Sequence, residues 1–458
     1  MAQHNDARVG KDLIERTLRH EPTDAIPWVP FAGVHAGKLV GYTAGEVLTD
    51  GDKLLESLLA VNRTYDPDGQ PIVFDLQIEA EILGCDLVWA DKGPPTVALH
   101  PLASRMEIPD HLPTPNDGRL PMVLDVMRRM KVEVGAKTAL YGLVTGVFTL
   151  ASHLRGTEIF MDMFDHPAFL SELLAYASAV VNRMSELYVG AGMDVIGVVD
   201  PLVSQISPRH FRKLLLQPYA GIFDLIRQRG VFSSFFVCGD ATKNIEVMCE
   251  TAPDSISIDE NIDLAAAKEI TDRYNITMGG NIPLTTHMLL GSQQDNMKFV
   301  VDLLATIDTH NFILAPGCDM PYDVPTENVV GVVQAIRDPE GTRAMLANYQ
   351  AETLDLGAVR LPEYDALDRP LVEVFTLDSD TCAACAYMRD AAVRATAELA
   401  GRVELVEYKF TERENVARVK KMGVKNLPSI YINGELKYSS LIPSNRELVD
   451  EIKKHLEA

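Results

Sequence analysis

The sequence of 458 residues lacks any apolar run near the roughly 18 residues that a membrane-spanning helix needs. Its first stretch, MAQHNDARVGKDL, is polar and lacks the apolar core of a signal peptide. Cysteine is scarce: six residues are scattered over the chain, which excludes a framework of disulfides. These absences predict a cytoplasmic globular protein.

Basic residues are also few, 42 against 65 acidic ones, and the formal net charge is −23. Almost all of this excess lies before Asp368, because the part from Asp368 onward holds 15 acidic and 14 basic residues. An acidic surface disfavours nucleic acid and anionic membranes as partners. It also disfavours a polyanionic small substrate unless the chain builds a local basic pocket.

A glycine-rich phosphate-binding turn after an early strand is missing as well. The nearest match, GAGMDVIG at residues 190–197, comes before a predicted strand, which argues against a dinucleotide-binding fold. Instead, about eight apolar runs alternate with helical patterns over about 340 residues, as in a (β/α)8 TIM-type barrel. One helix is predicted to begin at Ser207-Pro208. The predicted strands are residues 26–31, 71–76, 140–146, 194–200, 233–239, 255–259, 276–281 and 312–318.

The alternating pattern weakens after residue 345 and resumes at a β-rich run, LVEVFTL, that begins at Leu371. The sequence therefore predicts a barrel over residues 1–345, a linker or docking strap over 346–370, and a second, smaller α/β domain over 371–458.

Cys382 and Cys385 open a predicted helix directly after this run. The free N–H groups of a helix N-terminus stabilise a thiolate, and a second cysteine one turn later can resolve a mixed disulfide. The unit resembles the thioredoxin-like family, in which the proline at the position of Pro428 is cis and faces the cysteine pair. The resemblance implies a redox site of Cys382, Cys385 and Pro428. A remnant used only for docking is the alternative, and a structural zinc is disfavoured because no second Cys or His pair lies nearby.

Cys238 and Cys318 each end a predicted strand of the barrel. Both strand ends would lie on the face where barrel enzymes carry their chemistry. Two thiolates there form a soft site suited to zinc, which usually takes at least three protein ligands. Two unrelated loop cysteines are the alternative. The nearby oxygen donors are Asp240, Asp259, Glu260 and Asp319.

The barrel resembles the uroporphyrinogen decarboxylase superfamily, and more closely its corrinoid-linked, zinc-dependent methyltransferase branch. The resemblance extends from RTLRHEPTDAIPW to GCDMPYDVPTENV. It rests on four stretches in particular: FDLQIEAEILGCDL at 74–87, VCGDATKNI at 237–245, SIDENID at 257–263 and APGCDMP at 315–321.

In that branch, zinc is bound by His-x-Cys at one strand end and by Cys at a later one. Cys238 and Cys318 match the two cysteines, but Phe236 stands at the histidine position. A third ligand therefore has to come from elsewhere, or zinc does not bind. Glu260 is the first choice, ahead of Asp240, Asp319, His35 and His153.

The decarboxylase itself binds a multi-carboxylate porphyrinogen through an arginine-rich loop after the first strand. Here that loop, VPFAGVHAGKLVGYT, has one lysine and no arginine. Asp75 nevertheless stands where the family aspartate faces the pyrroles. Asp75, Glu79 and Glu81 are candidate proton donors.

The resemblance implies a methyltransferase that moves a methyl group between a small methylated substrate, or a thiol, and a cobamide carried by a corrinoid protein, with zinc as a cofactor. Two alternatives remain. One is a lyase that decarboxylates a tetrapyrrole or another carboxylic acid, and the other is a non-catalytic redox or binding module. The direction of transfer and a homodimeric state stay open.

Overall fold

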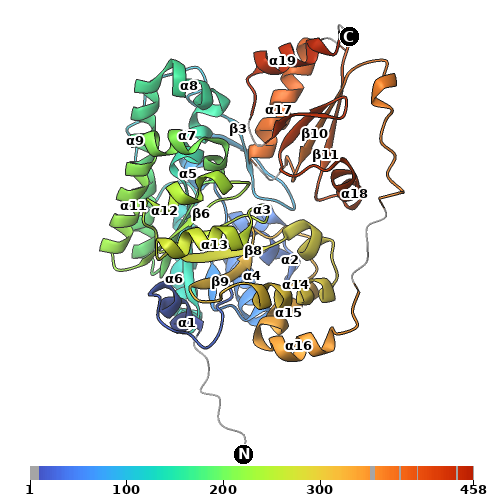
Figure 1. Ribbon diagram of the computed structural model, residues 1–458. Helices are drawn as coiled ribbons and strands as arrows, with labels where there is room; N and C mark the ends of the chain where they lie inside the picture. The colour runs from blue at the N-terminus through green and yellow to red at the C-terminus, as the bar shows by residue number, and fades with distance from the viewer. Residues whose placement is uncertain (1–9, 351–355, 381–382, 400, 440–441, 457–458) are drawn as a thin grey trace, which may run out of the picture. The chain divides into compact units, whose positions relative to one another are not determined.

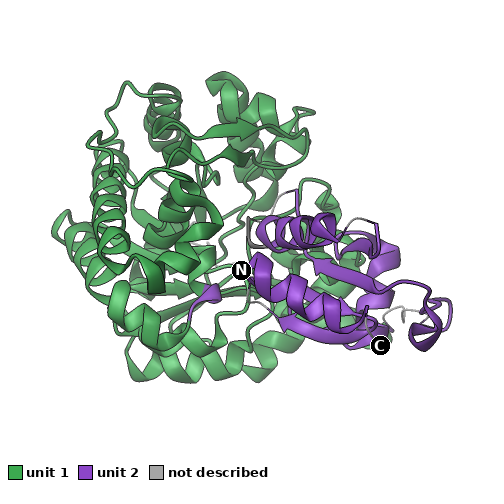
Figure 2. Cartoon of the chain, turned by 90° about the horizontal axis from the view of Figure 1, so that it is seen from above, with its two compact units in different colours: residues 1–203, 207–349 green, residues 204–206, 350–458 purple. Residues whose placement is uncertain are grey.

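The computed structural model describes residues 10–350, 356–380, 383–399, 401–439 and 442–456. The chain divides into two compact units, one of residues 1–203 and 207–349 and the other of residues 204–206 and 350–458 (Figure 2). The domain limits expected at residues 345 and 371 stay a prediction.

A curled parallel sheet forms the centre of the larger unit. Seven strands follow one another in the order β1-β4-β5-β6-β7-β8-β9. Strands β6, β8 and β9 are labelled among the helices of this unit in Figure 1. Trp28 makes a parallel bridge to Leu314 of β9, and its carbonyl accepts the N–H of Asp68 (2.9 Å) beside β1. This segment bonds to both edges of the sheet and closes it, which confirms the predicted barrel. The strands are β1 Gly69–Pro71, β4 Ala139–Thr145, β5 Val195–Val199, β6 Phe232–Phe236, β7 Ser255–Ser257, β8 Thr277–Ile282 and β9 Phe312–Pro316.

Two strand predictions were wrong in extent. The run at residues 26–31 contributes only the bridge at Trp28. The run at residues 71–76 leaves the sheet, because β1 ends at Pro71. There the chain turns: the Asp75 carboxylate accepts the N–H of Gln77 (2.8 Å), which favours a turn over an extended strand. An antiparallel hairpin, β2 Asp86–Val88 with β3 Thr96–Leu99, was not predicted because its residues are largely exposed and lack a clear apolar alternation.

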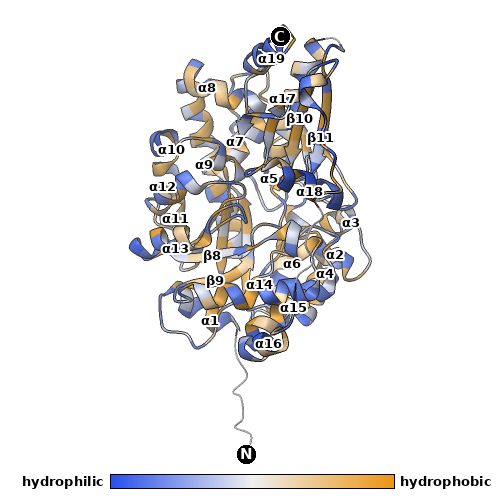
Figure 3. Cartoon of the chain, turned by 45° about the vertical axis from the view of Figure 1, so that its right-hand side comes forward, coloured by the Kyte–Doolittle hydropathy of each residue, from blue (hydrophilic) through white to orange (hydrophobic). Residues whose placement is uncertain are grey.

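Helices separate the strands and cover the sheet. The predicted start at Ser207 is confirmed: its hydroxyl accepts the N–H of His210 (3.3 Å), and Pro208 occupies the first turn. Almost all residues of the barrel strands are buried, including polar ones such as Gln70, Ser234 and Ser257, whereas the covering helices mix hydrophobic and hydrophilic residues (Figure 3). The main helices are α1 Gly10–Leu18, α2 His35–Lys38, α3 Ala44–Thr49, α4 Gly51–Tyr65, α5 Ile78–Ile82, α6 Leu120–Glu133, α7 Val147–Arg155, α8 Ile159–Asp165, α9 Pro167–Gly190, α10 Pro208–Leu214, α11 Leu216–Gln228, α12 Ile245–Cys249, α13 Leu264–Arg273, α14 Gln293–Thr306, α15 Thr326–Arg337 and α16 Pro339–Met345.

The smaller unit has its own four-stranded sheet in the order β11-β10-β12-β13. Strand β10 is parallel to β11 and antiparallel to β12, and the unit has its own buried core around Val372, Met388 and Leu448. This is the thioredoxin-like arrangement expected from the sequence. Its elements are β10 Leu371–Thr376, α17 Ala383–Glu398, β11 Glu404–Lys409, α18 Arg413–Met422, β12 Ser429–Ile432, β13 Glu435–Ser439 and α19 Asn445–Lys454.

None of the helices in the described residues is long and apolar enough to span a membrane.

Candidate functional site at the carboxyl ends of the barrel strands

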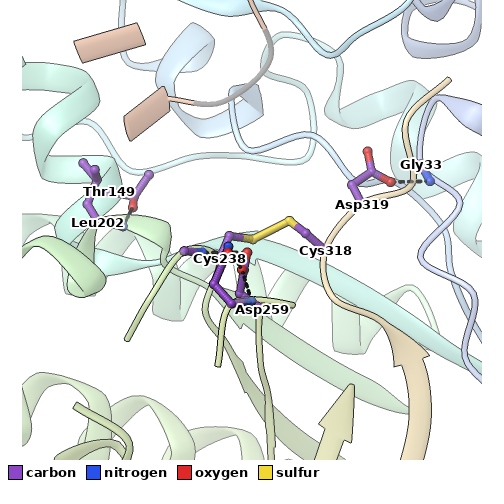
Figure 4. The surroundings of a disulfide bond; sticks show 9 residues. Gly33, Thr149, Leu202, Cys238, Asp259, Cys318 and Asp319 are labelled. Carbon is purple, nitrogen blue, oxygen red and sulfur yellow. Dashed lines mark hydrogen bonds between the residues drawn. A yellow bond between two sulfur atoms is a disulfide. The ribbon is translucent and has the colours of Figure 1, made fainter. Parts of the chain in front are cut away.

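Cys238 and Cys318 lie two residues beyond the ends of β6 and β9 and meet there. Their Cα atoms are 6.1 Å apart, and the two sulfurs form a disulfide across 80 residues of sequence (Figure 4). Strands β7 and β8 lie between β6 and β9 in the sheet, so the bond spans the barrel end rather than a neighbouring strand pair. Both side chains are half-buried. The sequence therefore placed the two cysteines correctly at one face, and their function as metal ligands stays a prediction.

Phe236, at the position of the family histidine, faces an aromatic cluster. Its ring centroid lies 4.7 Å from that of Phe31 and 5.7 Å from that of Phe74. All three rings belong to the buried core against which Cys238 and Cys318 pack. The site beneath the sulfurs is therefore apolar, and Phe236 is a packing residue with no donor atom for a metal.

Asp259 follows β7 and holds the turn after Cys238. Its carboxylate accepts the N–H of Gly239 (2.8 Å) and of Asn261 (2.9 Å). The side chain is buried, and burial raises its pKa. Asp240 points back into its own loop, where it accepts the hydroxyl and N–H of Thr242.

Glu260 and Asp319 are tied to other loops. Burial raises the pKa of Glu260 to about 8, and the backbone N–H groups of Leu284 and Thr285 partly oppose this rise. Asp319 accepts the N–H of Gly33 (2.7 Å), and burial raises its pKa well above the ordinary value. Gly33 has to be glycine, since a Cβ there would lie 2.6 Å from the Asp319 carboxylate oxygens.

The two histidines considered from the sequence are buried elsewhere. His35 lies 2.7 Å from the Tyr65 hydroxyl and 3.0 Å from the Tyr322 carbonyl, and burial lowers its pKa to about 4. His153 lies inside α7, and burial lowers its pKa to about 3.

The donor set does not fit zinc. Among the described residues, no group of three or more His, Cys, Asp or Glu side chains is placed to hold a metal ion. Zinc sites in proteins usually have at least three protein ligands, and here only two thiols meet. Glu260, the first choice for a third ligand, therefore belongs to no such group in the described part of the chain.

A buried charged network surrounds Asp75. Arg119, which precedes α6, donates from Nη1 to Asp75 (2.6 Å) and from Nε to Glu81 (2.7 Å). The guanidinium also lies over the ring of Trp89, 5.0 Å from its centroid. Sequence reasoning missed Arg119, because it searched for arginine only in the loop after the first strand. The available signal was the pair of acids at 75 and 81, which need a cation if buried.

Glu79 of α5 is buried against Thr145, the last residue of β4. Its carboxyl oxygens accept the N–H (3.0 Å) and the hydroxyl (2.7 Å) of Thr145. Burial raises its pKa, so the protonated form is favoured to a higher pH than in water. Glu79 can therefore hold a proton in a region that excludes water.

In the smaller unit, the structure describes two of the three predicted redox residues, Cys385 and Pro428. Cys385 is buried, and its sulfur accepts the N–H of Leu377 at 3.3 Å. The Leu427–Pro428 peptide bond is cis, as the resemblance implied. Cys382 lies outside the described residues. The redox function of the three residues stays a prediction.

Comparison with known families adds two matches. The sequence model of the uroporphyrinogen decarboxylase family matches residues 10–339, and that of a thioredoxin domain matches residues 371–453.

Curated relatives match the barrel at modest identity. A methylcobamide:CoM methyltransferase, MtbA of Methanosarcina acetivorans, is 25% identical over 336 residues, which cover 72% of this chain and 97% of the relative. MtaA of Methanosarcina barkeri, with the same description, is 26% identical and covers 71% of this chain and 96% of its own length. A uroporphyrinogen decarboxylase of Nostoc punctiforme is 23% identical, and the alignment covers 61% of this chain and 80% of the relative.

Among solved structures, a methyltransferase from Methanosarcina mazei aligns with a TM-score of 0.67 at 23% identity, over 72% of this chain and 99% of that one. This likeness supports the barrel fold.

Proposed function

Because the chain belongs to the uroporphyrinogen decarboxylase family, we propose that its barrel catalyses methyl transfer between a small methylated substrate, or a thiol, and a cobamide carried by a corrinoid protein. The observation that carries this proposal is the meeting of Cys238 and Cys318 at the ends of β6 and β9. These are the two cysteines that match the methyltransferase branch. Two methylcobamide:CoM methyltransferases that align over 97% and 96% of their length support the same choice.

Zinc has no step in the proposed reaction, since the described residues supply two thiols and no third ligand. The acids predicted from the sequence have distinct surroundings instead. Asp75 is held by Arg119 and suits the binding and orientation of a polar group of the substrate. Glu79 is buried with a raised pKa and suits storage of the proton that a leaving amine, alcohol or thiol takes up when its methyl group departs.

The test is a methyl-transfer assay under anaerobic, reducing conditions. The protein is incubated with a cob(I)amide and a panel of methylated amines, alcohols and thiols, and formation of the methylcobamide is followed by its absorbance. The reverse reaction uses methylcobamides and small thiols. We expect turnover with at least one pair, and an about 10²- to 10⁴-fold slower reaction for Glu79→Gln, which keeps the shape but loses the acid. No exchange with any methylcobamide would overturn the proposal.

A lyase is the second candidate, favoured by one observation. Asp75 has a buried arginine beside it, and Nη2 of Arg119 has no hydrogen-bond partner among the described residues. A guanidinium with a free donor can bind a carboxylate of a substrate. Release of CO2 from a porphyrinogen or a smaller carboxylic acid, without methyl transfer, would favour this candidate. Activity in neither assay would favour the non-catalytic redox or binding module.

A further inference from the structure

We propose that Cys238 and Cys318 form a dithiol–disulfide couple that exchanges with a protein dithiol of the thioredoxin type, in place of the zinc site expected for this branch. The two thiols are those on which the proposed function rests, but the redox exchange does not require methyl transfer. The two activities can therefore be tested separately.

The geometry of the barrel places the two sulfurs together. Their Cα atoms are 6.1 Å apart, inside the range of about 4.4–6.8 Å that disulfides span. Each cysteine follows a buried strand of the same sheet, and both pack against the core cluster that contains Phe236. The pair can therefore close and open without a rearrangement of the strands.

The described residues around Cys238 and Cys318 do not supply a third metal ligand. The nitrogen donor of the family is replaced by Phe236, which packs on Phe31 and Phe74. Asp259 and Asp319, which are drawn around the disulfide in Figure 4, each accept a backbone N–H: Asp259 from Gly239, and Asp319 from Gly33. Two thiols with no third ligand form a redox couple more readily than a zinc site.

Exposure separates this pair from the other cysteines of the barrel unit. Cys238 and Cys318 are half-buried, whereas Cys85 and Cys249 are buried, 5% and 2% exposed. Burial also raises the pKa of both buried thiols to about 12, so they stay protonated and unreactive. Exchange with a dithiol is therefore directed to Cys238 and Cys318.

A dithiol of the required class is encoded in the same chain. Residues 371–453 match a thioredoxin domain, and the sulfur of Cys385 accepts the N–H of Leu377 at 3.3 Å. The reductant is thus a protein dithiol, supplied either by this chain's own Cys382 and Cys385 or by a separate thioredoxin.

The exchange balances in two steps. A thiolate of the donor attacks one sulfur of the Cys238–Cys318 bond, which breaks, and the other cysteine leaves as a thiolate that takes up a proton. The second donor thiolate then attacks the mixed disulfide and releases the remaining barrel thiol, which is protonated in turn. Two electrons and two protons pass to the barrel pair, and the donor dithiol becomes a disulfide.

The experiment measures the thiol state of the full-length protein. The reduced protein is treated with a mild oxidant, and differential alkylation with mass spectrometry then gives the oxidised fraction of the Cys238 and Cys318 peptides. We expect a Cys238–Cys318 disulfide, and we expect free thioredoxin with its reductase and NADPH to reduce it at least about tenfold faster than a monothiol at equal concentration. A Cys238→Ser variant is the control, because its single Cys318 cannot form this bond.

A Cys382→Ser, Cys385→Ser variant tests whether the electrons come from the chain's own dithiol or from a separate thioredoxin. If the chain's own dithiol is the donor, limiting small dithiol reductant reduces the barrel pair at least about tenfold more slowly in this variant than in the parent. Equal rates assign the donor to a separate thioredoxin.

A measurement of the zinc bound per chain can contradict the redox proposal. About one zinc per reduced parent chain, lost in a Cys238→Ser, Cys318→Ser variant, together with resistance to disulfide formation, would overturn the redox proposal. A Phe236→His variant restores the family's third donor and serves as the positive control for zinc binding. Absence of methyl transfer with an intact redox exchange would reject the proposed function alone.

Discussion

Arg119 connects two carboxylates that come from the stretch after β1. It donates to Asp75 at 2.6 Å and to Glu81 at 2.7 Å, and its side chain is 10% exposed. Removing one partner of a buried ion pair leaves the other partner uncompensated. Asp75 would therefore lose the cation that makes its burial tolerable.

We expect Arg119→Met to lower the free energy of unfolding of the barrel by about 3–5 kcal/mol, because Asp75 is left buried and unpaired. Urea unfolding followed by tryptophan fluorescence measures the change. Arg129→Met is the matched control, since Arg129 of α6 pairs with the exposed Asp52 of α4 and we expect little change there. Equal effects of the two substitutions would contradict a buried network around Asp75.

His35 makes the stability of the barrel depend on pH. Burial lowers its pKa to about 4, from an ordinary value of 6.5. As the pH falls from 7 toward about 4, the unfolded chain binds a proton at His35 that the folded barrel does not bind. The contribution of His35 to stability is therefore full above pH 6.5 and is lost as the pH falls toward about 4.

We expect the loss at His35 to amount to roughly 2.5 kcal/mol of unfolding free energy between about pH 7 and about pH 4.5. Urea unfolding at the two pH values measures it, and His35→Gln removes this part of the pH dependence. The exposed His310→Gln serves as the control and leaves the difference unchanged. The same pH dependence in parent and His35→Gln would show that His35 does not stay neutral in the folded barrel.

Between β12 and β13, the turn Asn433-Gly434 has left-handed backbone at both residues, with φ of 48° and 78°. This is the conformation of a type I′ hairpin turn. The turn also meets the segment before β10, because a Cβ on Gly434 would lie 2.6 Å from a ring carbon of Tyr364. Tyr364 in turn donates its hydroxyl to Glu373 of β10 (2.9 Å). Part of the segment expected as a linker or docking strap is thus packed onto the sheet that follows it.

We expect Gly434→Ala to destabilise the β12–β13 hairpin more than Gly423→Ala does. Both positions have positive φ, so both alanines would cost about 1–2 kcal/mol of backbone strain. Only at Gly434 would the new methyl group also displace the Tyr364 ring, since Gly423 has no atom within 4 Å of its Cβ position. Hydrogen–deuterium exchange of the β12 and β13 amides measures the effect. Equal exchange in the two variants would show that Tyr364 gives way freely.

The chain as a whole consists of two units with separate sheets and separate buried cores. Both tryptophans, Trp28 and Trp89, lie in the barrel unit, so tryptophan fluorescence reports on the barrel alone. Far-ultraviolet circular dichroism reports on the helices and strands of both units. The two signals therefore distinguish joint from separate unfolding.

We expect the two probes to give non-coincident urea transitions, because each unit buries its own core and can unfold as its own cooperative body. Substitutions confined to the smaller unit, such as Gly434→Ala, should then shift only the transition seen by circular dichroism. Coincident transitions for both probes would show that the two units unfold as one.

The amino-acid sequence by itself determined the fold class of both units and the strand ends on which the barrel cysteines lie. The alternation of apolar runs and helical patterns is a local property, and parallel strands necessarily bring their carboxyl ends to one face. Cys238 and Cys318 could therefore be placed together from the sequence. The cis bond before Pro428 could also be predicted, because it belongs to a short motif of the thioredoxin-like family.

Only the tertiary structure decided what surrounds those cysteines. Arg119 and Asp75 are 44 residues apart in the sequence, and Gly33 and Asp319 are 286 residues apart. The spacing of apolar residues predicts local helices and strands, but it does not predict which residues meet over such separations. Whether a carboxylate near the cysteines is a ligand or a backbone acceptor depends on such contacts. Phe236 is a packing residue rather than a metal ligand for the same reason: its partners, Phe31 and Phe74, come from segments far away in the sequence, and burial of the three rings depends on the closed barrel.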